Sequence, residues 1–332
     1  MHFIYSNLLK DLAKNRVDSQ KPRKDGLTYI IDRFQGLDKE NFEILAPFVD
    51  MVKIHGALPL LASDTLLKQK IKFYHDLGVQ VSTGSTITEF AILEHSLERL
   101  AKEAAAIGFD TIEIGENSVD ISMERKRKIM DLVTSLDINV QWKVGRKDPR
   151  HQLNAEETSY KIGDALKLGS KKVVLEANEG VSVGIYDEKS LIKWNLIGAI
   201  TAKFPPSTFI FEAPLESQQS ALIAEFGQRV NLAEIHSESV ESQRRGFLSK
   251  AAFGVSYLRK DPEGGPAAKF IYYIIKTKHP IEQSDLISLS HLPRRTVQGA
   301  IDELKLQGLI IGRNSLDDAR KRVYIPIHSD WL

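Results

Sequence analysis

Short apolar runs alternate with longer amphipathic stretches along the first 260 residues. The stretches have the three- and four-residue apolar spacing of helices, and two of them, 87–109 and 155–169, end at or beside a glycine suited to a helix C-terminus. The apolar runs are rich in β-branched residues and predict strands at 28–32, 51–56, 79–83, 111–116, 139–145, 172–177, 209–213 and 230–235. Strands that alternate with helices predict a parallel sheet.

Eight strand–helix units within about 250 residues are typical of an α/β fold, the (β/α)8 TIM barrel. We assign this barrel to residues 1–260. The competing doubly wound sheet normally carries a glycine-rich fingerprint after its first strand, whereas "RFQGLDKEN" follows here. The next segment, "DPEGGPAAK" at 261–269, combines two prolines with two glycines and predicts a linker.

Residues 270–332 predict a small second domain. Helical patterns at 269–278, 282–290 and 291–310 precede a hairpin-like segment, "IIGRNSLDDARKRVYIPI". This order is typical of a winged helix-turn-helix domain, and the segment resembles those of regulators. Side chains of the third helix and the hairpin are predicted to contact double-stranded DNA: Arg294, Arg295, Thr296, Gln298, Arg313, Arg320, Lys321 and Arg322. The alternative is a winged helix that serves only protein contact or dimerisation.

Composition limits the partners. The formal net charge is +1, so DNA binding would need a local basic patch, and we expect a homodimer if DNA is read. The chain has no cysteine, which excludes disulfides, thiolate metal ligands and a cysteine nucleophile. No run approaches the roughly 18 apolar residues of a membrane span, and the first 16 residues lack a cleavage site. We therefore expect a cytoplasmic protein without membrane contact.

Charged residues recur where the predicted barrel strands end. Alternation sets Lys53, Glu113 and Lys143 on the faces opposite their apolar neighbours, while Glu176 and Glu212 end their strands. Barrel active sites lie at these carboxyl ends. One interpretation is Mg2+ held by Glu113, Glu176 and Glu212, with lysines that bind a small anionic metabolite. The other is a set of ion pairs that closes one end of the barrel.

A series of motifs resembles the phosphosulfolactate synthase family over residues 20–250. In chain order they include "KPRKDGLTYIIDRFQG", "STGSTITEFA", "TIEIGENSVDIS", "KVGRKDP" and "FIFEAPLESQQSALIAEFG". The resemblance implies a barrel that uses Mg2+ to add sulfite to phosphoenolpyruvate, an early step towards coenzyme M. In that reaction, negative charge builds on an enolate and a proton must reach the carbon that bears the phosphate. A cation at the carboxylate and a positioned lysine would supply both needs.

Roles are expected of residues that match the family and, for Lys143 and Arg146, of basic residues beside the matched positions. Catalysis is expected of Lys53, Lys143 and Lys147. Substrate binding is expected of Arg23, Thr86, Arg146, Gln218, Gln219 and Asn231. For the two glutamines, capping of a helix start is the alternative. His55, at the end of a strand, is either an acid or base or a structural residue.

Three departures from the family pattern bear on the substrate. After Lys53 the family has Gly-Trp-Gly-Thr, but this chain has "HGALP". Lys143 stands where the family has glutamate, which reverses a charge. The sixth loop, "EANEGVSVGI", lacks the arginine and lysine of a glycine-rich phosphate cradle. Each lost charge-assisted contact costs roughly 1.5–3 kcal/mol unless Lys143, Arg146 or Lys147 compensates.

Three functions are therefore compared. The first is a Mg2+-dependent carbon–sulfur lyase fused to a DNA-binding type of winged helix. The second is a ligand-sensing transcriptional regulator whose degenerate barrel binds a small anion. The third is a barrel that catalyses a different lyase reaction.

Overall fold

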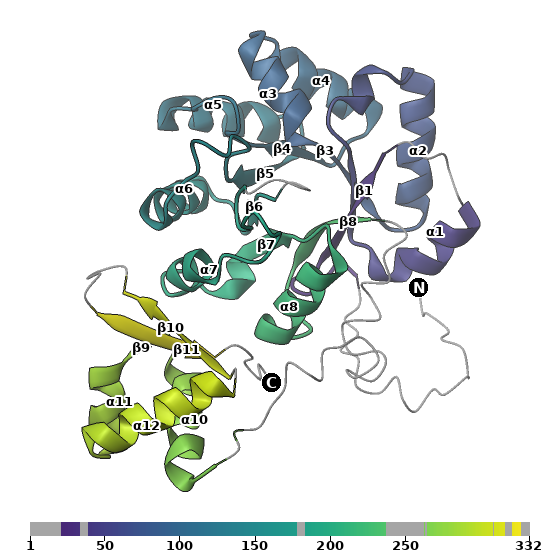
Figure 1. Ribbon diagram of the computed structural model, residues 1–332. Helices are drawn as coiled ribbons and strands as arrows, with labels where there is room; N and C mark the ends of the chain where they lie inside the picture. Colours follow the sequence, from purple (N-terminus) through teal and green to yellow (C-terminus); the bar gives the residue numbers. More distant parts are fainter. Residues whose placement is uncertain are drawn as a thin grey trace.

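Eight parallel strands close into a barrel in the computed structural model (Figure 1), which describes residues 21–33, 39–177, 183–236, 262, 264–307, 309–315 and 321–326. The strands are β1 (Thr28–Asp32), β2 (Met51–Ile54), β3 (Gln80–Thr83), β4 (Thr111–Ile114), β5 (Asn139–Val144), β6 (Val173–Leu175), β7 (Phe209–Glu212) and β8 (Leu232–His236). They pair in chain order, and β8 pairs with β1. All eight predicted strands and the barrel fold are confirmed.

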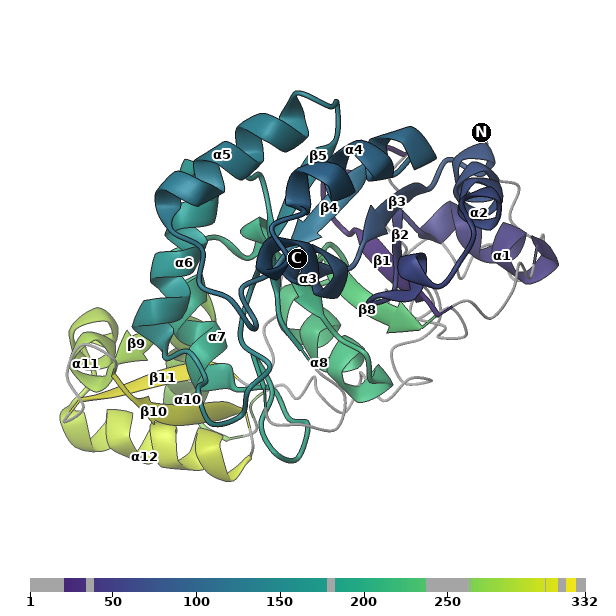
Figure 2. The ribbon, with the colours of Figure 1, turned by 90° about the horizontal axis from the view of Figure 1, so that it is seen from above.

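Helices cover the outside of the barrel (Figures 1 and 2). They are α1 (Lys39–Leu45), α2 (Asp64–Asp76), α3 (Ser85–Leu93), α4 (Leu97–Ile107), α5 (Met123–Thr134), α6 (Ala155–Lys167), α7 (Trp194–Thr201) and α8 (Glu216–Phe226). The single helix predicted over 87–109 is two helices, because His95 adopts a left-handed φ of 52° between α3 and α4. Within the described ranges, no helix combines the length and apolarity of a membrane span.

The inside of the barrel is apolar at one level and charged at the next. Leu27, Val174, Ile210 and Ala233 form a buried cluster within the barrel, and the partly buried Tyr29 packs against it. Side chains two residues apart on a strand share a face, so Glu212 points inward one step beyond Ile210. The apolar layer therefore forms the floor beneath the charged carboxyl ends of the strands.

The C-terminal unit has its own hydrophobic core. It comprises α10 (Pro266–Lys278), β9 (Ile281–Glu282), α11 (Gln283–Ser290), α12 (Arg294–Leu306), β10 (Ile310–Asn314) and β11 (Arg322–Pro326). The three strands form an antiparallel sheet in the order β10, β11, β9. Ile271, Leu286, Val297 and Ile301 are fully buried in the core between the helices and this sheet.

The linker prediction is wrong for residues 266–269, which belong to α10. Pro266 occupies the first turn of this helix, where its fixed φ is helical and its missing N–H needs no partner. Proline and glycine therefore mark a helix start here rather than a continuous linker. The predicted barrel end at residue 260 lies outside the described residues.

Candidate active site

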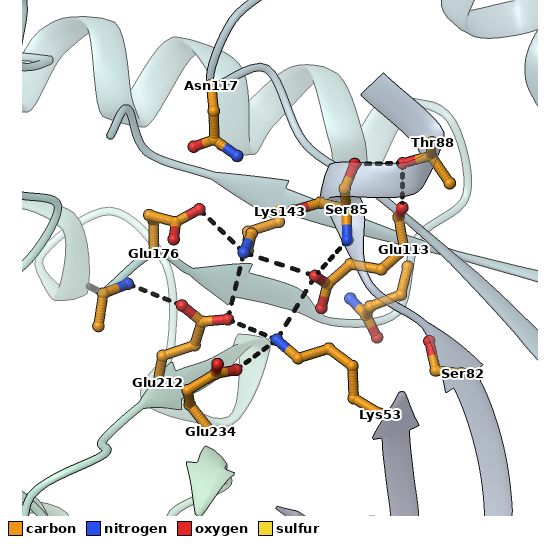
Figure 3. A network of polar contacts seen from close by, with 12 residues as sticks. Lys53, Ser82, Ser85, Thr88, Glu113, Asn117, Lys143, Glu176, Glu212 and Glu234 are labelled. Atoms are coloured by element: carbon orange, nitrogen blue, oxygen red, sulfur yellow. Dashed lines mark hydrogen bonds and ion pairs between the residues drawn. The ribbon is translucent and has the colours of Figure 1, made fainter. Parts of the chain in front are cut away.

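Lys53 lies on β2 at the carboxyl end of the barrel, surrounded by carboxylates (Figure 3). Its Nζ lies 3.0 Å from Glu212 Oε1 and 3.6 Å from Glu113 Oε1, and it also pairs with Glu234. The lysine, Glu113 and Glu212 are all buried. Three strands besides β2 therefore direct carboxylates at one ammonium group.

Lys143 on β5 occupies the opposite side of the same carboxylate cluster (Figure 3). Its Nζ lies 2.9 Å from Glu176 Oε2, 3.3 Å from Glu212 Oε1 and 3.5 Å from Glu113 Oε1. Glu113 and Glu212 thus contact both lysines. Lys53 and Lys143 are called the lysine pair below.

The carboxylates fix the charge of the lysine pair. Burial alone would lower the pKa of Lys143, but Glu176, Glu212 and Glu113 raise it well above its ordinary value. The same balance of burial against carboxylates raises the pKa of Lys53. Burial would raise the pKa of Glu212, yet Lys143 and Lys53 lower it to about 2. At neutral pH the two ammonium groups and the Glu212 carboxylate are therefore ionised.

For Glu176, burial outweighs the neighbouring lysine, so its pKa shifts in the direction opposite to that of Glu212. Burial raises its pKa to about 7, against the opposing effect of Lys143. Burial likewise raises the pKa of Glu234, more than Lys53 lowers it. A group with a pKa near neutrality can both give and take a proton at physiological pH, which suits an acid or base.

Two glycines hold Glu176 in place. A Cβ added at Gly145 would lie 2.1 Å from Glu176 Cβ, and one added at Gly184 would lie 1.9 Å from the Glu176 carbonyl oxygen. Gly184 also has a left-handed φ of 57°. Chain segments before and after Glu176 therefore approach its backbone and side chain more closely than any other residue type would permit.

A pocket lies above the lysine pair, at the carboxyl ends of the strands. Its wall includes the N-terminus of α3, where Ser85 N donates to Glu113 Oε1 over 3.2 Å. Positive groups also line it, and the N-terminus of a helix favours anions. The cationic and polar lining residues are Arg33, Lys53, His55, Ser85, Thr86, Lys143 and Lys147.

The predicted magnesium ligands lie together but do not surround an open position. Glu113, Glu176 and Glu212 all contact Lys143, as in the ion-pair alternative. In the part of the chain that the structure describes, no three carboxylate or imidazole side chains form a metal-ligand group. The residues present therefore do not fit the predicted Mg2+ site.

Glu234 is a site residue that the sequence prediction missed. It points into the pocket from β8 and pairs with Lys53. Its φ of 58° is unusual for a residue other than glycine and accompanies a shift in the register between β1 and β8. Simple alternation would have missed it, because Ala233 shares the inward face of Glu212 and the backbone irregularity brings the next side chain, Glu234, inward as well.

The structure corrects the substrate-binding prediction for Arg23 and Asn231. Arg23 pairs with Asp50 at 3.0 Å, just before β2. Asn231 Oδ1 accepts from Leu27 N over 3.2 Å, and its Nδ2 donates to Phe209 O over 2.8 Å. These contacts lie where strands begin, at the end of the barrel opposite the pocket. Both residues tie strands together there.

Gln218 and Gln219 bond to the backbone at the start of α8, as in the helix-capping alternative. Gln218 Oε1 accepts from Leu215 N over 3.0 Å, and Gln219 Nε2 donates to Ala213 O over 3.0 Å. Neither side chain lines the pocket. Arg146 follows β5 and pairs with Asp120 instead of lining the pocket. Of the predicted substrate-binding residues, Thr86 alone lines the described pocket.

The first turn of α12 carries three of the residues predicted to contact DNA. Arg294, Arg295 and Thr296 are exposed there. Gln298 accepts from Gln283 and donates to Asp302, so its amide is already bonded on both sides.

The predicted DNA-contacting residues of the hairpin differ in exposure and pairing. Arg322 is exposed, and Lys321 pairs with Glu282 at 3.2 Å. Arg320 lies outside the described residues.

Arg313 faces the barrel, so the prediction that it contacts DNA is wrong. A Cβ added at Gly198 on α7 would lie 3.5 Å from its Nη1. Burial lowers the pKa of Arg313 to about 9, although Glu225 opposes this shift. The guanidinium is therefore half-buried beside α7.

A barrel with a charged pocket at the carboxyl ends of its strands defines a TIM-barrel enzyme. Residues 16–250 match the family described as (2R)-phospho-3-sulfolactate synthase (ComA), so this chain belongs to that family and is a lyase that forms a carbon–sulfur bond. The match ends before the C-terminal unit.

Several relatives carry the name phosphosulfolactate synthase. That of Methanothermobacter thermautotrophicus is 34% identical over 238 residues, which are 69% of this chain and 92% of the relative. That of Methanocaldococcus jannaschii is 30% identical over 232 residues, 67% and 92% of the two chains. That of Bacillus subtilis is 26% identical over 246 residues, 71% and 96% of the two chains. The resemblance inferred from the motifs is confirmed.

Proposed function

We propose that the barrel adds sulfite to phosphoenolpyruvate or to a closely related phospho-enol acid. The observation that carries this proposal is the lysine pair, whose two buried ammonium groups line a pocket at the carboxyl end of the barrel. Relatives named for the synthesis of phosphosulfolactate support the choice of substrate.

The reaction needs a place for negative charge and a source of one proton. A sulfur lone pair of sulfite forms the carbon–sulfur bond at the methylene carbon, and the electron pair of the double bond moves towards the carboxylate. The ammonium groups of Lys53 and Lys143 stabilise that charge. The carbon that bears the phosphate then takes a proton, so that no group leaves and the atoms balance.

Two residues are positioned to supply this proton. Glu176 lines the pocket and has its pKa raised to about 7 by burial, so a large fraction is protonated at neutral pH. Lys147 Nζ lies 4.0 Å from Glu176 Oε1 and is partly exposed at the mouth. Lys147 and Arg33, which also lines the pocket, would bind the phosphate in place of the basic residues absent from the sixth loop.

The proposed activity is tested with the purified full-length chain, sulfite and phosphoenolpyruvate, followed by phosphorus NMR. The expected result is a new phosphate-ester signal that requires sulfite. Absence of turnover with phosphoenolpyruvate and with other phospho-enol acids would refute the proposal. Mg2+ stays a prediction from the family resemblance, and the assay is run with and without it.

We propose as a second function that the C-terminal unit is a winged helix that binds double-stranded DNA as a homodimer. The order of three helices and an antiparallel hairpin supports this, as do the exposed Arg294 and Arg295 at the start of α12. The whole chain would then couple gene control to an anionic metabolite bound in the barrel. A mobility shift with DNA from upstream of its own gene should show binding that weakens steeply with salt. Binding that is absent or insensitive to salt would contradict it.

A further inference from the structure

The lysine pair occupies the centre of the carboxylate cluster. Glu212 Oε1 lies 3.0 Å from Lys53 Nζ and 3.3 Å from Lys143 Nζ, and Glu113 Oε1 lies 3.6 and 3.5 Å from the same two atoms. Mg2+ requires oxygen ligands at about 2.0–2.1 Å in octahedral geometry. An ion bound to these two oxygens would lie next to both ammonium groups, which would repel it.

The carboxylates are also balanced by positive side chains without a metal. Four carboxylates belong to the cluster: Glu113, Glu176, Glu212 and Glu234. Four cationic side chains line the pocket beside them: Arg33, Lys53, Lys143 and Lys147. With all four carboxylates ionised the negative and positive charges cancel, and with Glu176 protonated the net charge is +1, so the cluster does not require a divalent cation for neutrality.

The ammonium groups, and not the central carboxylate, face the pocket. Lys53 and Lys143 line it, whereas Glu212 does not. Glu212 instead pairs with both lysines, and its second oxygen accepts from Ala177 N over 2.8 Å. Glu212 therefore supports the lysine pair from behind, and the two ammonium groups reach the pocket wall, which they share with Glu113, Glu176 and Glu234.

We propose that the lysine pair takes the role of a divalent cation, so that it binds the carboxylate of the phospho-enol acid directly and neither binding nor turnover requires Mg2+. The identity of the substrate rests on the proposed function. The conclusion that the cluster holds no metal rests on the geometry of the lysine pair alone. Lys53 and Lys143 are catalytic residues in this account, because they contact the carboxylate on which negative charge develops. Glu212 is a positioning residue.

Metal binding is measured with EDTA-treated full-length protein and Mn2+, which substitutes for Mg2+ and is counted by electron paramagnetic resonance. The wild-type chain is expected to bind no Mn2+ below 1 mM (about the affinity of a weak surface site). Two variants remove the ammonium group from the carboxylates. Lys143→Glu introduces the glutamate that the family resemblance places at this position, and Lys143→Gln is the milder change. Both are expected to gain one Mn2+ site.

A matched control is Lys126→Gln. Lys126 is another buried lysine, paired with Glu116 at 2.7 Å away from the pocket. This control is expected to bind no Mn2+. One tight Mn2+ site in the wild-type chain, lost in Glu212→Gln, would overturn the proposal. Failure of both Lys143 variants to gain a site would overturn it as well.

Substrate binding is then measured by calorimetry with phosphoenolpyruvate and the EDTA-treated protein. The dissociation constant is expected to stay within twofold when Mg2+ is added, and to rise at least tenfold in Lys143→Gln but not in Lys126→Gln. Binding that appears only with Mg2+ would overturn the proposal. No binding under either condition would refute the proposed substrate, while the Mn2+ count would still decide whether the lysine pair excludes a metal.

Discussion

Replacement of Gly145 by alanine should damage the site through Glu176. Gly145 has a φ of 152°, which side-chain-bearing residues rarely adopt, and an added Cβ would lie 2.1 Å from Glu176 Cβ. The contact is between two backbone-proximal carbons, so rotation of a flexible side chain cannot relieve it. Glu176 must move away from Lys143, which it contacts at 2.9 Å.

The magnitude follows from two costs. An unfavourable backbone conformation costs about 1–3 kcal/mol. An extra carbon in a packed core costs about 1–3 kcal/mol more. The free energy of unfolding of Gly145→Ala should therefore fall by about 2–6 kcal/mol. At about 2–4 °C for each kcal/mol, the Tm should fall on the order of 10 °C.

The matched control is Gly163→Ala, within α6. A Cβ there meets nothing within 4 Å, and alanine in a helix interior should stabilise by about 0.5–1 kcal/mol. Thermal unfolding and sulfite addition are measured for both variants. Gly145→Ala is expected to lose stability and activity while Gly163→Ala keeps both. Equal stability of the two variants would refute the packing of Gly145 against Glu176.

Three further predictions follow from charges. Activity should fall as the pH rises through about 7, because burial raises the pKa of Glu176 to that value and the proton donor is lost above it. Glu176→Gln should lack this pH limb, whereas an unchanged limb would exclude Glu176 as the donor. Glu212 has its pKa lowered to about 2 from 4.5, so its stabilisation is present above pH 4.5 and lost as the pH falls towards 2. Urea unfolding between pH 5 and 3 should show a flatter loss of stability in Glu212→Gln than in the wild type, and parallel curves would contradict this. Arg294→Ala should weaken DNA binding by about tenfold (about 1.4 kcal/mol) in a mobility shift, while Arg313→Ala should not, because Arg313 faces the barrel; equal losses would contradict the placement of Arg313.

Alternation along the strands predicted the fold and three residues of the site. It identified the inward faces of Lys53, Glu113 and Lys143, because a two-residue period is a local property of the chain. The same period states which face a residue occupies but not which end of the barrel it reaches. Asn231 precedes β8 and therefore lies at the far end, whereas Glu234, three residues later, reaches the pocket.

Pairing between distant residues could not be predicted from the sequence. Glu212 and Lys53 are separated by 159 positions, and only the closed barrel shows that they pair. Carboxylates at strand ends are compatible with both a metal and ammonium groups, so the sequence left both interpretations open. Similarly, the hairpin pattern predicted β10 and β11, but not that Arg313 on β10 faces α7.

The lysine pair stabilises the negative charge that develops during the addition of sulfite. The most direct test of this proposal is the rate of sulfite-dependent product formation by the wild type, Lys53→Met and Lys126→Met under identical conditions. The expected result is turnover by the wild type and Lys126→Met, and a loss of at least about 100-fold in Lys53→Met, comparable to the removal of one stabilising donor from a transition state. Equal rates in Lys53→Met and the wild type, or no product from the wild type, would contradict it.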